Sequence, residues 1–192
     1  MCELPSSWYS TSHTTSFKTD FYRMTGNEWK VNLSNICKFI FQHNIRFMYH
    51  YRKYSQSHSV YRKYKIYRYS RKYGIEFAPD VQIGKGLYLG HPYNITVGGG
   101  VKIGNNVNLS KGCTLGMENR GNRRGVPVIG NHVVIGINAT VVGRITIGDD
   151  VFIAPNSFVN FDVPDHSVVV GNPGVIHRKK DATLAYINFS VE

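Results

Sequence analysis

The chain of 192 residues has few cysteines and no long apolar run. Its three cysteines, Cys2, Cys37 and Cys113, are an odd number without close spacing, which argues against a disulfide framework or a zinc site and indicates a reducing compartment. The N-terminal residues lack the apolar stretch of a secretory signal, and no apolar run approaches the roughly 18 residues that span a bilayer. We therefore expect a cytoplasmic protein.

Acidic residues are absent between Glu28 and Glu76. This interval holds eleven of the 23 Lys and Arg residues, so the remaining 12 balance the 12 acidic residues and the interval carries the whole formal charge of +11. Eight tyrosines are interleaved with the cations. Such a segment attracts anions, and an anionic membrane face or an acidic glycan fits it, whereas no nucleic-acid recognition motif accompanies the charge. The alternative is a solvated helical arm whose tyrosines pack on the rest of the protein or on a neighbouring subunit.

Between Val128 and Pro164 an aliphatic residue returns at every sixth position. The repeating residues are Ile129, Ile135, Val141, Ile147, Ile153 and Val159. Residues able to face inward stand four places after them: Val133, Ala139, Ile145, Val151, Ser157 and Val163. This hexapeptide repeat predicts a mainly β fold in which short parallel strands coil into a three-sided solenoid around an aliphatic column.

The period of the apolar residues changes near Gly74. Before it, apolar residues keep helical spacing, first in Trp29, Leu33, Ile36 and Ile40 and then in Val60, Tyr64 and Tyr67. After it the period is six. We therefore expect a polar leader, over about the first 25 residues, and a basic, aromatic helical arm within residues 1–74, a β-helix domain over residues 75–176, and a tail over residues 177–192.

Two irregularities interrupt the repeat. The frame of Val97, Ile103 and Leu109 lies two residues beyond that of Ile83 and Leu89, so two extra residues must bulge out, and we place them in His91-Pro92-Tyr93-Asn94. Residues 117–127 have no periodicity and predict an extruded loop that carries three arginines. Loops on a rigid scaffold are frequent places for binding and catalysis.

The segment from Gly74 to Lys180 resembles the serine acetyltransferase branch of the hexapeptide-repeat, left-handed β-helix acyltransferases. The matching motifs are Gly74-Ile75-Glu76, Ile83-Gly84-Lys85-Gly86, His91, Thr114-Leu115-Gly116, Pro127, Ile135-Gly136, Ala139, Gly143, Val163-Pro164 and Gly171-Asn172-Pro173. The resemblance implies a left-handed coil, a homotrimer, and acetyl-CoA bound in a groove between subunits.

Within this resemblance, His91 is the expected general base that takes the proton of an acceptor hydroxyl during direct acetyl transfer. Glu76 stands where the family has the acid that orients this histidine, with Asp80 as a substitute.

The remaining expected contacts are divided between cofactor and acceptor. Cofactor-binding candidates are Gly116, Gly136, Asn138, Ala154, Lys179 and Lys180. Acceptor-binding candidates are Tyr93, Arg120, Arg123 and Arg124. No metal is expected, because a carbonic anhydrase on this coil needs three converging histidines and the repeats contain only His91 and His132. Cys113 occupies an inward hexad position, so a buried small residue is favoured over a nucleophile.

Two departures from the family pattern bear on the acceptor. Gly125-Val126 stands where the serine acetyltransferases carry an Arg-His pair, and Gly90 stands where they carry Asp. A site for a zwitterionic amino acid without such groups would leave charges unpaired. We therefore expect an O-acetyltransferase acting on a sugar hydroxyl in capsular or other surface polysaccharide synthesis. The alternatives are a serine O-acetyltransferase of cysteine biosynthesis and a non-catalytic structural solenoid.

Overall fold

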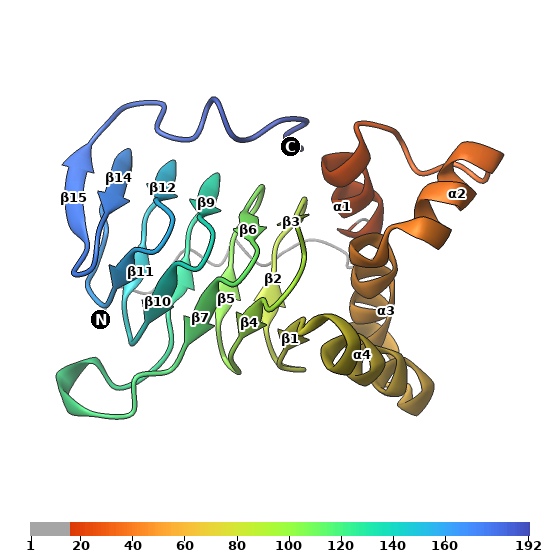
Figure 1. Cartoon of the computed structure of the whole chain (residues 1–192), viewed down its shortest axis with the longest axis horizontal. Helices are drawn as coiled ribbons and strands as arrows, with labels where there is room; N and C mark the ends of the chain where they lie inside the picture. Colours follow the sequence, from red (N-terminus) through yellow and green to blue (C-terminus); the bar gives the residue numbers. More distant parts are fainter. Residues whose placement is uncertain (1–15) are drawn as a thin grey trace.

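The computed structural model describes residues 16–192, so the first part of the expected leader lies outside the described residues. Within this range, helices gather at one end and short strands coil away from them (Figure 1). The helices are α1 (Ser16–Thr25), α2 (Leu33–Phe41), α3 (His43–Ser57) and α4 (Val60–Tyr73). Gly74 ends α4 in the left-handed conformation, with φ of 67°, at the position where the period of the apolar residues changes.

The strands of residues 76–178 form three sheets, one on each side of the coil (Figure 1). Sheet A contains β1 (Glu76–Phe77), β4 (Thr96–Val97), β7 (Thr114–Gly116), β10 (Thr140–Val142) and β13 (Phe158–Val159). Sheet B contains β2 (Gln82–Ile83), β5 (Lys102–Ile103), β8 (Val128–Ile129) and β11 (Thr146–Ile147). Sheet C contains β3 (Tyr88–Gly90), β6 (Asn108–Ser110), β9 (Val133–Ile135), β12 (Val151–Ile153), β14 (Ser167–Val170) and β15 (Val175–Arg178). The predicted parallel solenoid is confirmed.

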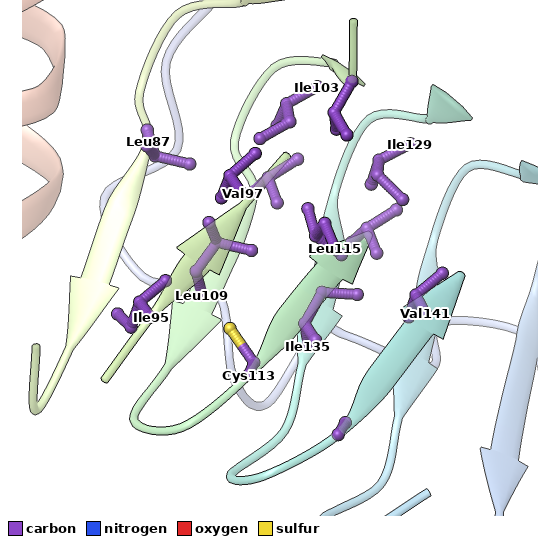
Figure 2. Close-up of a cluster of buried hydrophobic side chains, with 14 of the residues drawn as sticks. Leu87, Ile95, Val97, Ile103, Leu109, Cys113, Leu115, Ile129, Ile135 and Val141 are labelled. Carbon is purple, nitrogen blue, oxygen red and sulfur yellow. The ribbon is translucent and has the colours of Figure 1, made fainter. Parts of the chain in front are cut away.

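The interior is the aliphatic column that the repeat predicts. Hexad residues stack in parallel register, for example Leu115 on Val141 and Val141 on Val159. All twelve inward residues named from the sequence are buried. Figure 2 shows Cys113 pointing into this column, and burial raises the pKa of its thiol to about 12. The protonated thiol therefore packs as a small core residue.

The corners between sheets C and A form a continuous line that we call the C–A edge. At each turn a corner N–H donates to the carbonyl one coil below: Gly112 to Tyr93 (2.9 Å), Asn138 to Lys111 (3.0 Å) and Asn156 to Ile137 (2.9 Å). Gly112, Asn138 and Asn156 have positive φ, a conformation that Gly and Asn adopt more easily than other residues. The edge is thus a ladder of tight turns with little side-chain bulk.

Residues 16–25 differ from the expectation of a loose leader, because α1 is folded and packed. Phe21 is fully buried, and its ring centroid lies 4.9 Å from that of Trp29. Asp20 is also fully buried and accepts hydrogen bonds from Arg52 at 2.9 and 3.0 Å. The partner of Asp20 stands 32 residues away in the sequence, so the polar composition of this segment concealed its fold.

Arg52 also joins the helices to the first coil. Its guanidinium donates to the carbonyls of Ile83 and Gly84, both at 2.7 Å, while Asp20 accepts from the N–H of Leu87 at 2.8 Å. A solenoid end exposes unpaired backbone groups, and terminal caps are needed to cover them. The buried Asp20–Arg52 pair supplies such a cap.

The C-terminal segment returns along sheet C toward α1 (Figure 1). Asp150 accepts from the N–H and hydroxyl of Thr183 at 2.9 and 2.8 Å, and Val191 exchanges two 2.8 Å hydrogen bonds with Asn106. The aromatic rings of Phe152 and Tyr186 stack at 4.4 Å. β15 pairs with β14 as far as Arg178, and the segment that runs back along sheet C begins after that residue.

Candidate functional site

His91 stands on the C–A edge of the first coil, in the corner between β3 and β4. The stacked core residues are eight positions apart across this corner (Leu89 to Val97) and six across the next (Leu109 to Leu115), so the corner holds two extra residues. His91 is exposed and has a φ of 48°, in addition to the positive φ of Asn94, so the bulge turns its side chain away from the column.

Aromatic rings from the helical layer support this corner. The ring of His43 stacks on that of Tyr73 with centroids 4.0 Å apart and meets the ring of Tyr93 at 5.0 Å. His43 Nε2 lies 3.0 Å from the carbonyl oxygen of Pro92, and burial lowers the pKa of His43 so that its neutral ring donates this bond. His43 and Tyr93 therefore support the backbone next to His91. Sequence reasoning missed the role of His43, because this residue precedes the repeat.

Of the two expected orienting acids, Glu76 lies on β1. The corner that carries His91 lies beside the start of β1, because the N–H of Asn94 donates to the carbonyl of Tyr73 at 3.0 Å. Glu76 Oε1 accepts a 3.1 Å hydrogen bond from the hydroxyl of Ser70. Asp80 stands in the corner between β1 and β2, a different edge of the coil. The topology thus places Glu76, and not Asp80, on the same side of the coil as His91.

Three of the six cofactor candidates share the edge of His91. Gly136, Asn138 and Ala154 lie in the corners that follow β9 and β12. A Cβ at Gly136 would lie 2.7 Å from the carbonyl oxygen of Ile153, so only glycine fits there. Ile137, between Gly136 and Asn138, is 42% exposed. Sequence reasoning missed it as a cofactor candidate, although an aliphatic residue at an outward position of the repeat could have indicated a binding surface.

The other cofactor candidates lie elsewhere on the chain. Gly116 ends β7, at the margin of sheet A away from the C–A edge. Lys179 donates its N–H to the carbonyl of His166 at 2.8 Å, which places it and Lys180 on the edge between sheets B and C. These three candidates do not meet His91 within one chain.

The extruded loop leaves the coil between sheets A and B (Figure 1). It contains a short 3₁₀ helix, η2 (Gly121–Arg123), and an antiparallel bridge between Glu118 and Gly125. Arg120, Arg123 and Arg124 are exposed. Arg123 donates to the carbonyl of Asn160, and its own carbonyl accepts from the N–H of Arg144 at 2.8 Å, which holds the loop on its own edge. The loop arginines and His91 are therefore on different edges of one chain.

Within residues 16–192, no group of three or more His, Cys, Asp or Glu side chains is placed to hold a metal ion. A shallow hollow lined by Val128, Thr146, Ile147, Asp149 and Asp165 lies on sheet B, the face opposite the C–A edge. We assign it no part in the chemistry of His91.

Comparison with known proteins identifies the type of coil. A family model described as bacterial transferase hexapeptide (six repeats) matches residues 127–160. The serine acetyltransferase of Helicobacter pylori is 39% identical over 99 residues, 52% of this chain and 58% of that protein. That of Staphylococcus xylosus is 41% identical over 106 residues, 55% and 49% of the two proteins. The crystal structure of Neisseria gonorrhoeae serine acetyltransferase in complex with serine has a TM-score of 0.68 at 26% identity, covering 86% of this chain and 69% of that chain.

The repeat is thus the hexapeptide repeat of bacterial transferases, and the fold is the hexapeptide-repeat left-handed β-helix seen in solved serine acetyltransferases. The chain spans about half the length of the curated relatives it matches. The expected sugar acceptor and the link to polysaccharide synthesis are wrong, since these relatives are named serine acetyltransferases. The pair Gly125-Val126 brings no charge, but the same loop carries three exposed arginines, so the loop as a whole is not without charge.

Proposed function

We propose that the chain is an acetyl-CoA-dependent serine O-acetyltransferase. The observation that carries the proposal is the two-residue bulge that turns His91 outward on the same edge as Gly136, Asn138 and Ala154. The serine acetyltransferase relatives support this activity over a structural solenoid.

In the proposed mechanism His91 acts as general base. Its neutral ring takes the proton from the serine hydroxyl while the oxygen attacks the thioester carbonyl of acetyl-CoA. The carbon–sulfur bond breaks when the tetrahedral intermediate collapses, and the protonated ring returns the proton to the leaving thiolate. The products are O-acetylserine and CoA. Glu76 is the proposed positioning residue that favours the histidinium form.

The small residues of the C–A edge are the proposed path of the pantetheine arm. Gly136 and Asn138 leave room for an extended chain to approach the backbone, and the exposed side chain of Ile137 offers it an apolar contact. Gly116, Lys179 and Lys180 reach the same cofactor only from a second chain.

A homotrimer would complete the site. Three-sided coils present flat faces, and a neighbour packed against one face brings its extruded loop toward the His91 edge. Arg120, Arg123 or Arg124 of that neighbour would then bind the serine carboxylate, for which a planar guanidinium is well suited. We place this reaction in the cytoplasm, where acetyl-CoA is available.

The test is to incubate the full chain with labelled acetyl-CoA and L-serine, and to identify the product by mass spectrometry while free CoA is titrated. Labelled O-acetylserine formed by wild type, and formed at least about a hundredfold more slowly by His91→Asn, would support the proposal. Acetyl-CoA turnover with other hydroxyl compounds but not with L-serine would refute the acceptor, and a wild-type rate in His91→Asn would refute the base.

A further inference from the structure

Helix α2 presents apolar side chains to solvent. Leu33 is 78% exposed and Phe41 is 80% exposed, and Ile36 and Ile40 are also exposed. Val31, just before the helix, is 85% exposed. Figure 1 shows α2 on the outer side of the helical layer, away from the solenoid. An exposed apolar cluster on one helix face marks an interaction surface.

The orientation of this face is fixed by the other side of the helix. Asn35 is buried and donates to the carbonyls of Glu28 and Lys30 at 3.0 and 2.9 Å. Phe39 packs on the rings of Trp29 and Tyr49, with centroids 5.9 and 5.4 Å apart. Because α2 is anchored through these residues, its apolar face cannot turn inward to the core of the same chain.

The surroundings of this face are cationic. No acidic residue occurs from residue 29 to residue 75, and the same interval contains eleven Lys and Arg residues. Lys38 belongs to α2, and Lys30, just before the helix, pairs with Glu28 at 2.9 Å. At the other end of the helical layer (Figure 1), α4 carries further exposed cations and the exposed rings of Tyr61, Tyr64 and Tyr67. Apolar residues beside Lys, Arg and Tyr are the composition of helices that lie in a membrane interface.

We propose that the apolar face of α2, with its flanking cations, docks the protein on the surface of an anionic lipid bilayer. A second copy is a poorer occupant, because the exposed cations of the two segments would repel each other. An acidic glycan or a nucleic acid would pair with the charges but leave Leu33 and Phe41 in water. A bilayer satisfies both groups, because the cations contact its anionic headgroups and the apolar side chains insert below them.

The bilayer contact is superficial. None of the helices within residues 16–192 is long and apolar enough to cross a membrane. With 9 residues, α2 lies in the plane of the interface, and its affinity rests on a few apolar side chains plus electrostatic attraction.

The experiment is co-sedimentation of the full chain with vesicles of phosphatidylcholine alone or mixed with phosphatidylglycerol. We expect binding to the anionic vesicles only, and weaker binding as salt is raised. The pair Leu33→Ser and Phe41→Ser should lower the partition coefficient at least about tenfold. Val175→Ser with Leu184→Ser, also exposed apolar residues, is the matched control. A double charge reversal in the helical layer, Lys38→Glu with Lys63→Glu, should weaken vesicle binding. It should do so more than the control reversal in the tail, Lys179→Glu with Lys180→Glu.

A second measurement separates insertion from adsorption. Phe41→Trp should give tryptophan fluorescence that brominated lipids quench beyond the quenching seen with wild type. Absence of binding to anionic vesicles, or binding that the serine pair leaves unchanged and that shows no extra quenching, would overturn the proposal. A serine pair that lowers the oligomer mass in light scattering without changing vesicle binding would assign the face to a second copy instead.

Discussion

At the scale of single residues, the conformation of His91 matters as much as its chemistry. The left-handed backbone at this position is one that Asn adopts readily and Ala does not, so alanine would add backbone strain to the loss of the ring. Asparagine is therefore the cleaner replacement.

For His91→Asn we expect the turnover number to fall by about a hundredfold to ten-thousandfold, the usual contribution of a general base. Thermal unfolding should be nearly unchanged, because the side chain is exposed. Release of CoA from acetyl-CoA and serine measures the first, and circular dichroism the second. A variant that retains the wild-type rate would show that another group is the base.

Substitution of Ile137 tests the proposed cofactor path, because its side chain is exposed. Ala154 is only 9% exposed, so a larger residue there would also disturb the core. Ile137→Ser should raise the Kd and KM for acetyl-CoA about tenfold, corresponding to about 1.4 kcal/mol of lost apolar contact, with little change in kcat. Calorimetric titration measures the Kd, with Val175→Ser as the control. Equal affinities in Ile137→Ser and the control would place the pantetheine elsewhere.

His50 should make stability depend on pH. Burial, together with the charges of Arg62, Lys65 and Arg46, lowers the pKa of His50 to about 4, and Arg62 donates to its Nδ1 at 2.9 Å. The unfolded chain takes up this proton near pH 6.5, so the contribution is complete above that pH and is lost as pH falls toward 4. Urea unfolding followed by the helix signal should lose more stability between pH 7 and pH 5 in wild type than in His50→Gln. Parallel losses in the two proteins would exclude His50 as the cause.

At the scale of elements, the helices close the open end of the solenoid. Beside the packing of Phe47 and Tyr51 on Phe77, the contact contains one buried ion pair that also satisfies backbone groups of the first coil. Removal of Arg52 would leave both a carboxylate and two carbonyls without their donor. The basic segment is thus a structural cap as well as a source of charge.

Arg52→Met should destabilise the protein by about 3–5 kcal/mol, because Asp20 would remain buried without a counter-charge. The control is Lys53→Met on the same helix, whose exposed side chain should contribute within about 0.5 kcal/mol. Denaturant unfolding of the two variants provides the comparison. Similar midpoints for both would mean that the pair does not hold the cap.

At the scale of the whole molecule, one chain presents the parts of the proposed site on separate edges. His91 and Gly136 share the C–A edge, whereas Lys179 and the loop arginines lie on the other two edges. A single convex edge cannot surround both a long cofactor and an amino acid. Activity should therefore depend on assembly.

Mixing two inactive proteins should restore activity. One is His91→Asn, and the other replaces Asn119–Arg124 by a two-residue Asn-Gly turn, which the antiparallel bridge between Glu118 and Gly125 can accept. Hybrid oligomers would contain sites with both an intact histidine and an intact neighbouring loop, and CoA release after subunit exchange measures them. Proven exchange without recovered activity, or full activity in a monomer, would rule out a shared site.

The coil and its interruptions could be predicted from sequence because each is a local pattern. Inward residues at a period of six, the glycine after α4 and the two extra residues around His91 all follow from spacing along the chain. The acceptor was predicted wrongly because the uncharged Gly125-Val126 and Gly90 were given more weight than the three arginines of the same loop. Spacing along the chain does not report which charges face one site.

Spacing along the chain is enough to predict the three-sided coil, its aliphatic column and the outward position of His91, since a repeat requires only that neighbours six residues apart share an environment. Four other features could be seen only in the folded chain: α1 is folded, Asp20 and Arg52 cap the first coil, His43 supports Pro92, and the apolar face of α2 is exposed. These features depend on which distant segments meet, and that is settled by the packing of the whole chain and not by any local period.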